Sequence, residues 1–258
     1  MRNIKAILMC SIGMAFVLAA PCRAELLEDG KWWGTPWQKV KQENYTLTIN
    51  SVGEVLVRGR NRITIGSPQM LFFWKNKSFS FHHDIHGKGP WKKVEGKREK
   101  MPDGTKITII GEVADIRIRQ TVHATSNSVT VKWDAEVIDP GPEMHWVRFI
   151  GHFFYCTGFS YKIKTTRGQT FQGKLGDPFV EMKEIESVEI TDNKYLTRIK
   201  FPRAVRKKIM HHENPRQQHL PAKYSFLPEG IRPRADLMPG DRFGYTMKVT
   251  IPSVSRAD

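Results

Sequence analysis

The sequence predicts an all-β protein: an antiparallel β-sandwich, of the jelly-roll or a related double-sheet kind, with few short helices. Three observations predict this fold. Apolar and polar residues alternate along most of the chain, turn-forming residues separate the alternating runs, and no strand–helix–strand rhythm is present. Alternation places every second side chain in a core and the others in water, which is typical of half-buried antiparallel strands. Many such strands without crossover helices favour two stacked sheets.

The alternating runs follow one another from the N-terminal third of the chain to its end. The apolar positions of the shorter runs are Tyr45, Leu47, Ile49, Val55, Val57, Ile63, Ile65, Phe79, Phe81, Ile107, Ile109, Ile116 and Ile118. The two longest runs contribute Val129, Val131, Trp133, Ala135 and Val137, and then Phe243, Tyr245, Met247, Val249 and Ile251. We expect these side chains to form the core.

Residues that favour turns gather between the runs, and they predict reversals of the chain. These stretches are Pro102–Gly104, Ser126–Ser128, Asp139–Pro142, Thr191–Asn193 and Met238–Asp241. One short helix is expected from Asp177 to Lys183, because Asp177 can cap it and Pro178 suits its first turn. The segment from Arg203 to Arg234 is rich in proline, histidine and basic residues, and predicts a long loop region with one or two short strands.

The N-terminus has the features of a secretory signal peptide. Arg2 and Lys5 precede an apolar run from Ala6 to Ala20, and small residues around Ala24 provide a cleavage site. The run is short for a membrane span, which is the alternative interpretation. We therefore expect residues 1–24 to be the signal peptide and residues 25–258 to form a single β-sandwich domain. The mature protein is expected in the periplasm or outside the cell, with no transmembrane segment after cleavage.

The chain is strongly basic, with 41 Lys and Arg against 26 Asp and Glu, a formal net charge of +15. This excess favours acidic partners. For an exported protein the candidates are sulfated or uronate-bearing polysaccharides, anionic surface polymers and lipid headgroups. No nucleic-acid-binding motif is visible, so no nucleic acid partner is expected. A generally basic, solvated surface is the alternative.

Two stretches resemble the galactose-mutarotase-like, or supersandwich, β-domains. IRIRQTVHATSNSVTVKWDAEV (Ile116–Val137) is similar to their paired strands, and LMPGDRFGYTMKVTIP (Leu237–Pro252) is similar to their last strand, entered through a Pro-Gly turn. The resemblance implies a carbohydrate-associated β-sandwich. The histidines and glutamate of the mutarotase active site have no matching positions here, so no catalytic residue is carried over.

The stretch FHHDIHGKGPWKK, from Phe81 to Lys93, concentrates histidine, aromatic and basic residues. On a strand, His82, Asp84 and His86 would share one face and could bind a divalent metal if the chain bends at Asp84. Their spacing matches no established metal signature. We therefore predict no cofactor, and keep a divalent ion as the alternative.

The second interpretation of this stretch is a carbohydrate-binding loop. An aromatic plane can cover the apolar face of a sugar ring, and lysines can meet its acidic groups. The candidate binding residues are Trp91, Lys88, Lys92, Lys93, His86 and, from the later basic segment, Arg206. The alternative is that Trp91 caps the core and the lysines are only solvated.

The sequence thus predicts an exported β-sandwich that binds carbohydrate, namely an anionic polysaccharide. Two alternatives stay open: a polysaccharide lyase or sugar epimerase that uses the histidine-rich loops, and a non-catalytic interaction module of the cell envelope. The sequence does not decide between binder and enzyme, because no arrangement of acid, base and nucleophile can be placed on these residues.

Overall fold

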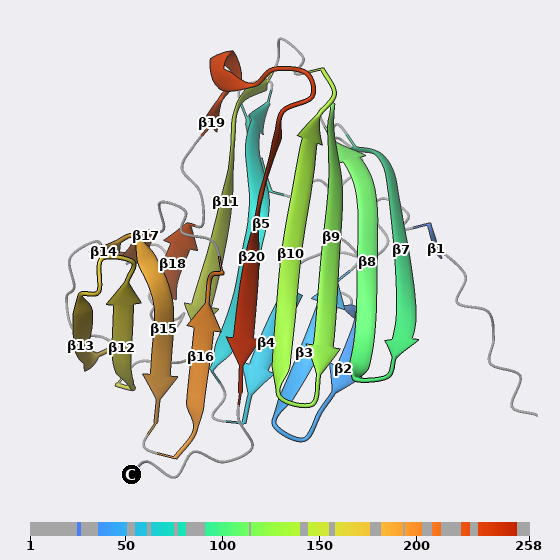
Figure 1. Ribbon diagram of the computed structural model, residues 1–258. Helices are drawn as coiled ribbons and strands as arrows, with labels where there is room; N and C mark the ends of the chain where they lie inside the picture. The colour runs from blue at the N-terminus through green and yellow to red at the C-terminus, as the bar shows by residue number, and fades with distance from the viewer. Residues whose placement is uncertain are drawn as a thin grey trace, which may run out of the picture.

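The computed structural model describes residues 25–26, 36–50, 55–60, 63–74, 77–80, 91–113, 115–139, 144–154, 158–175, 182–192, 194–202, 208–212, 223–227 and 232–251. Within these ranges the chain is almost entirely β-structure, and its one helical element is a single 3-10 turn, η2 (Arg234–Asp236). The strands form two stacked antiparallel sheets (Figure 1). The predicted all-β antiparallel sandwich is therefore confirmed.

Sheet A has ten strands and lies nearer the viewer in Figure 1. In spatial order its strands are β1 (Glu25–Leu26), β7 (Trp91–Met101), β8 (Gly104–Val113), β9 (Ile116–Thr125), β10 (Ser128–Val137), β20 (Arg242–Thr250), β16 (Leu196–Lys200), β15 (Ile185–Thr191), β12 (Ser160–Thr165) and β13 (Thr170–Lys174). The strands β7 to β10 form a meander, because each tight turn returns the chain beside its predecessor. β20 joins this meander to the remaining strands by pairing with both β10 and β16.

Sheet B lies behind sheet A. Its main path is β14 (Met182–Lys183), β17 (Lys208–His212), β18 (Lys223–Leu227), β11 (Met144–Phe154), β5 (Thr64–Trp74), β4 (Val55–Gly59), β3 (Tyr45–Asn50) and β2 (Pro36–Lys41). Off this path, β19 (Arg232–Pro233) pairs with β11 and β6 (Lys77–Ser80) pairs with β5.

The core lies between the two sheets, and the predicted alternation supplies it. Trp133 is only 1% exposed, and every other expected core residue that the structure describes is also buried. The side chains of Phe79 and Phe81 lie outside the described residues. Burial of these apolar side chains is the main favourable contribution to folding, at about 25 cal/mol per Å² of apolar surface removed from water.

A buried tyrosine links the two sheets. The hydroxyl of Tyr45, on β3, donates to the carbonyl oxygen of Thr125 at 2.5 Å and lies 3.1 Å from that of Ser128, at the turn between β9 and β10. Burial raises the pKa of Tyr45 to about 12, because a phenolate would lose its hydration there. At the open edge of the sandwich, Arg98 of β7 donates to the side-chain oxygen of Gln38 on β2 at 3.1 Å.

Two expectations about the second half of the chain need correction. The helix expected from Asp177 to Lys183 is wrong at its end, because Met182 and Lys183 form β14 and pair with β17; residues 176–181 lie outside the described residues. The segment from Arg203 to Arg234 contains three strands, β17, β18 and β19, where one or two were expected. In both places, pairing with distant strands outweighs the local signal.

Among the described residues, no helix has the length and apolar character that crossing a membrane requires.

Candidate functional site

The outward face of sheet A presents charged side chains to solvent, whereas its inward face contributes apolar side chains to the core. Along β10, Lys132, Asp134 and Glu136 alternate with the buried residues Trp133 and Ala135. The same alternation holds on β9 and β20, so three neighbouring strands present polar side chains to solvent from one surface.

Strand register aligns these side chains in rows that run across the sheet. The row nearest the end of β10 contains Glu112, Arg117, Glu136 and Arg242. The next row contains Ile110, Arg119, Asp134 and Gly244, and the third contains Thr108, Thr121, Lys132 and Thr246. Neighbours within a row belong to adjacent strands, about 4.8 Å apart.

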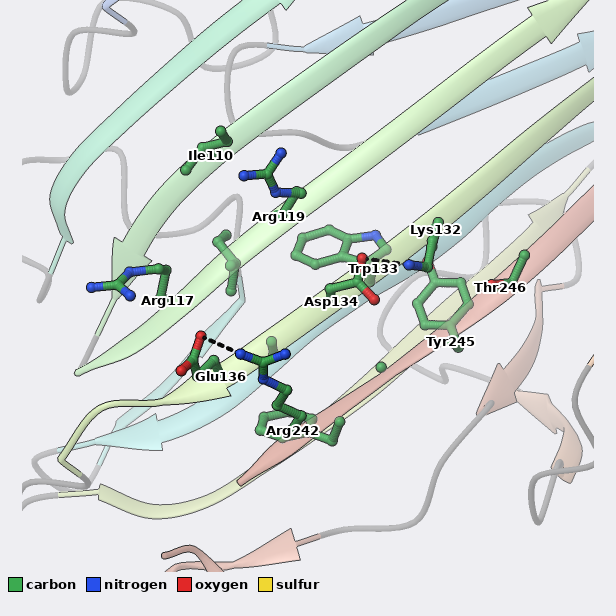
Figure 2. Close-up of a pocket in the computed structure, with 14 residues that line it drawn as sticks. Ile110, Arg117, Arg119, Lys132, Trp133, Asp134, Glu136, Arg242, Tyr245 and Thr246 are labelled. Atoms are coloured by element: carbon green, nitrogen blue, oxygen red, sulfur yellow. Dashed lines mark ion pairs between the residues drawn. The ribbon is translucent and has the colours of Figure 1, made fainter. Parts of the chain in front are cut away.

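These rows enclose an open hollow of about 780 Å³, which we call the sheet A groove. Its lining residues come from β8, β9, β10 and β20: Ile110, Arg117, Ile118, Arg119, Lys132, Trp133, Asp134, Ala135, Glu136, Arg242, Phe243, Gly244, Tyr245 and Thr246. Figure 2 shows Arg117 and Arg119 projecting from β9, while the carboxylates of Asp134 and Glu136 on β10 are paired with Lys132 and Arg242. The groove therefore combines cations, carboxylates and an apolar position at Ile110.

Gly244 leaves the middle row without a side chain on β20. A Cβ at this position would lie 2.0 Å from the carbonyl oxygen of Trp133 and 2.9 Å from its carbonyl carbon. Such contacts are far inside van der Waals distance, so β10 and β20 approach one another more closely here than a side chain allows. The glycine therefore lets the backbone of β20 lie directly against the backbone of β10 at Trp133 and Asp134.

The charges in the groove are only partly neutralised. Lys132 Nζ lies 2.8 Å from Asp134 Oδ2, and Arg242 Nη2 lies 3.6 Å from Glu136 Oε2 (Figure 2). With 52% and 50% of their side-chain surfaces exposed, Lys132 and Asp134 form a weak pair that a ligand can replace. Within the described part of the chain, no hydrogen bond or ion pair is found for the exposed side chains of Arg117 and Arg119.

Two guanidinium groups on one strand, with no ion pair among the described residues, can recognise an acidic group. The planar fork of arginine matches the two oxygens of a carboxylate, or of a sulfate, through parallel hydrogen bonds. Arg117 and Arg119 are two residues apart on β9, so their side chains leave the same face about 7 Å apart. The groove is thus suited to an anionic, hydroxyl-rich ligand.

Three of the binding residues predicted from the sequence lie at the start of β7, at the end of sheet A that carries the row with Arg117. The structure describes the backbone of Trp91, Lys92 and Lys93, which begin β7, but not their side chains. Register places Lys93 opposite Glu112, at the end of the row that contains Arg117.

The other predicted site residues are outside the described part of the chain. For carbohydrate binding these are Lys88, His86 and Arg206, and for the metal alternative they are His82, Asp84 and His86. Among the residues that are described, no group of three or more His, Cys, Asp or Glu side chains could hold a metal ion. The proposed loop and metal sites therefore stay predictions.

Sequence reasoning missed the groove residues Arg117, Arg119, Asp134 and Arg242. Each occupies an outward position in an alternating run, where a charged residue is ordinary. The available signal was the pair of arginines alternating with isoleucines in IRIR, but its meaning depends on which strands lie beside it.

Comparison with known proteins supports the fold. No family model and no curated protein matches the chain. Among solved structures, Slr1438 from Synechocystis sp. PCC 6803 superposes with a TM-score of 0.51 at 11% identity, covering 84% of this chain and 96% of that one.

Two further solved structures are similar at a lower level. A galactose mutarotase related enzyme from Lactobacillus acidophilus has a TM-score of 0.47 at 10% identity, over 85% of this chain and 98% of the other. The 4-alpha-glucanotransferase of Thermococcus litoralis has a TM-score of 0.47 at 9% identity, over 82% of this chain and 37% of the other.

Proposed function

We propose that the protein binds an anionic polysaccharide in the sheet A groove. The observation that carries the proposal is the pair of exposed arginines, Arg117 and Arg119, which lack an ion pair among the described residues and border an open groove. Their neighbours Ile110 and Asp134 complete the chemistry of a sugar site, because one offers an apolar surface and the other accepts hydrogen bonds from hydroxyl groups.

The shape of the groove favours a polymer over a small molecule. It is open to solvent along four strands, whereas sites for small ligands usually enclose most of the ligand surface. A polysaccharide chain can lie across such a surface with only one or two of its residues in the groove.

The proposal includes the loop predicted from the sequence. Since β7 begins with Trp91, Lys92 and Lys93 at the groove end of sheet A, the preceding residues His86 and Lys88 are proposed to extend the site. The same ligand would then meet aromatic and basic groups beside Arg117.

We also propose that the protein acts outside the cytoplasm, in the periplasm or as a secreted protein. The support is the basic N-terminal region followed by the apolar run from Ala6 to Ala20. N-terminal sequencing of the mature protein should begin at Glu25, and a mature chain that still begins at Met1 would contradict cleavage.

The binding experiment uses polygalacturonate as the acidic probe and dextran as the neutral one, measured by calorimetric titration. We expect the wild type to bind polygalacturonate and the double variant R117A/R119A to bind it at least about tenfold more weakly, a loss of about 1.4 kcal/mol. Following the same mixtures in the ultraviolet for unsaturated products tests the lyase alternative.

The matched control is K39A/K41A, which removes two exposed cations from β2 in sheet B. This variant should bind as the wild type does, because its lysines lie on the other sheet. Equal binding by the wild type and R117A/R119A, with both variants equally stable to heat, would remove the groove from the proposal.

A further inference from the structure

The outward face of sheet A has a second hollow, well separated from the groove. It measures about 590 Å³ and lies over the strands β12, β13, β15 and β16. Its lining residues are Ser160, Tyr161, Lys162, Gln172, Gly173, Lys174, Glu189, Thr191 and Leu196. This β12–β16 hollow combines two lysines, hydroxyl groups, one carboxylate and one partly exposed aliphatic side chain, so it resembles the groove in mixing cations with carboxylate and apolar groups.

The carboxylate of the second hollow is already neutralised. Arg198 Nε donates to Glu189 Oε1 at 2.6 Å. Across the described chain, no ion pair is found for Lys162 or Lys174, and both are exposed. The hollow therefore keeps two cations for a ligand, as the groove does.

Two lysines lie between the groove and the hollow. Lys248 of β20 and Lys200 of β16 are direct cross-strand partners, and both are exposed. In the register of the sheet, Lys248 is followed by Thr130 on β10, and Lys200 is followed by Ser187 on β15, whose side chain is buried. Like charges placed directly opposite are unfavourable, and neither flanking residue supplies a carboxylate, so a bound anion would relieve their repulsion.

We propose that the ligand is an extended acidic polysaccharide that crosses the outward face of sheet A from the groove, over Lys248 and Lys200, to the β12–β16 hollow. The inference rests on the proposed function and adds the length and path of the ligand. From Arg119 on β9 to Lys162 on β12 the path crosses five strand intervals and drops by six residues along β20, from Gly244 to Thr250. With strands about 4.8 Å apart and a rise of about 3.4 Å per residue, the path is about 30 Å long.

The strands along this path are consecutive neighbours in sheet A and lie side by side on the near face in Figure 1. A chain of about 30 Å contains several sugar residues, and a single sugar or disaccharide reaches only one end. The inference is therefore specific about ligand size: long chains use both hollows, and short ones use one.

The chemistry along the path favours a polysaccharide over a nucleic acid. Single-stranded nucleic acids are usually held by exposed aromatic rings. The outward positions of β9, β10, β20 and β16, all of which the structure describes, carry no Phe, Tyr or Trp, and the β12–β16 hollow adds Tyr161 at the end of the path.

The test compares the wild type with K200E/K248E, using digalacturonate and long polygalacturonate as probes. We expect long-chain binding to fall at least about tenfold, because two attractive cations become repulsive carboxylates. Digalacturonate binding should stay unchanged, because the groove is intact. The control K39E/K41E makes the same change in net charge on β2, and should retain long-chain binding.

The outcomes separate the two proposals. If the wild type binds neither probe, the proposed function fails. If it binds both probes with equal affinity, or if K200E/K248E binds long chains as K39E/K41E does, the groove stands and the extended path is overturned. Binding of oligothymidylate or phosphatidylserine vesicles that depends on Lys200 and Lys248, without binding of polygalacturonate, would also overturn it.

Discussion

The two faces of β10 and β20 differ in composition and burial, although alternate residues of the same two strands form them. On the inward face, Trp133 and Met247 are almost completely buried. On the outward face, Lys132 and Arg242 are exposed and carry only weak ion pairs. Nine residue pairs hold the two strands in register, so each face is positioned by the other.

This difference predicts two separate roles for neighbouring residues: the buried ones stabilise the fold, and the exposed ones are available to a ligand. Substitutions on the inward face should change the free energy of unfolding, and those on the outward face should change binding alone. The predictions below test this separation, in order of decreasing expected effect.

The largest effect is expected from Trp133→Ala. This change removes a fully buried indole from the middle of the core, and we expect the free energy of unfolding to fall by about 3–5 kcal/mol. Urea denaturation followed by circular dichroism measures it. The control is the next residue, Asp134→Ala, which faces solvent and should cost about 0.5 kcal/mol or less. Similar losses in both variants would contradict the separation of faces.

An intermediate effect is expected from Gly244→Ala, at the position where the backbone of β20 lies directly against that of β10. The new Cβ would contact the Trp133 carbonyl, so β10 and β20 must move apart, at a cost of about 1–3 kcal/mol. Thermal unfolding measures this loss, and titration with polygalacturonate should show weaker binding as well. Thr246→Ala, two residues along the same face, is the matched control and should leave stability near the wild-type value. Unchanged stability of the alanine variant at 244 would show that the strands tolerate a side chain.

The smallest effect is expected from Tyr45→Phe, which removes the hydroxyl that links the sheets. Loss of this buried hydrogen bond should cost about 1 kcal/mol. The pKa of Tyr45 is raised from 10.0 to about 12, so its contribution is complete below pH 10 and is lost as the pH rises towards 12. Urea denaturation across this range should show a shallower decline for Tyr45→Phe than for the wild type.

The control for that experiment is Tyr195→Phe, a partly exposed tyrosine near Lys194. It should retain the decline of the wild type over the same pH range. If Tyr45→Phe also retains it, another group is responsible for the loss of stability in alkali.

Much of the fold could be predicted because its signals are local. Alternation marks Val131 and Trp133 as inward residues without knowledge of their neighbours, and the stretch Pro102–Gly104 marks the turn between two adjacent strands. The expected helix ending at Lys183 failed for the opposite reason. Its capping pattern is local, but β14 is determined by pairing with the distant β17.

The groove could not be predicted, because it is a product of register. Ile110, Arg119, Asp134 and Gly244 form one row but come from four strands, and β20 is far from the others in sequence. No single stretch contains the site. The predicted binding stretch that ends at Lys93 lies at the groove end of sheet A only because β7 pairs with β8.

The central position of β20 also constrains the order in which the protein folds. β10 ends at Val137 and β20 begins at Arg242, yet the two are immediate neighbours in sheet A. The meander from β7 to β10 can assemble as soon as it is synthesised, but it keeps an unpaired edge until β20 arrives. Closing so long an intervening segment is slow, so a late intermediate with that edge exposed is the species most prone to aggregate.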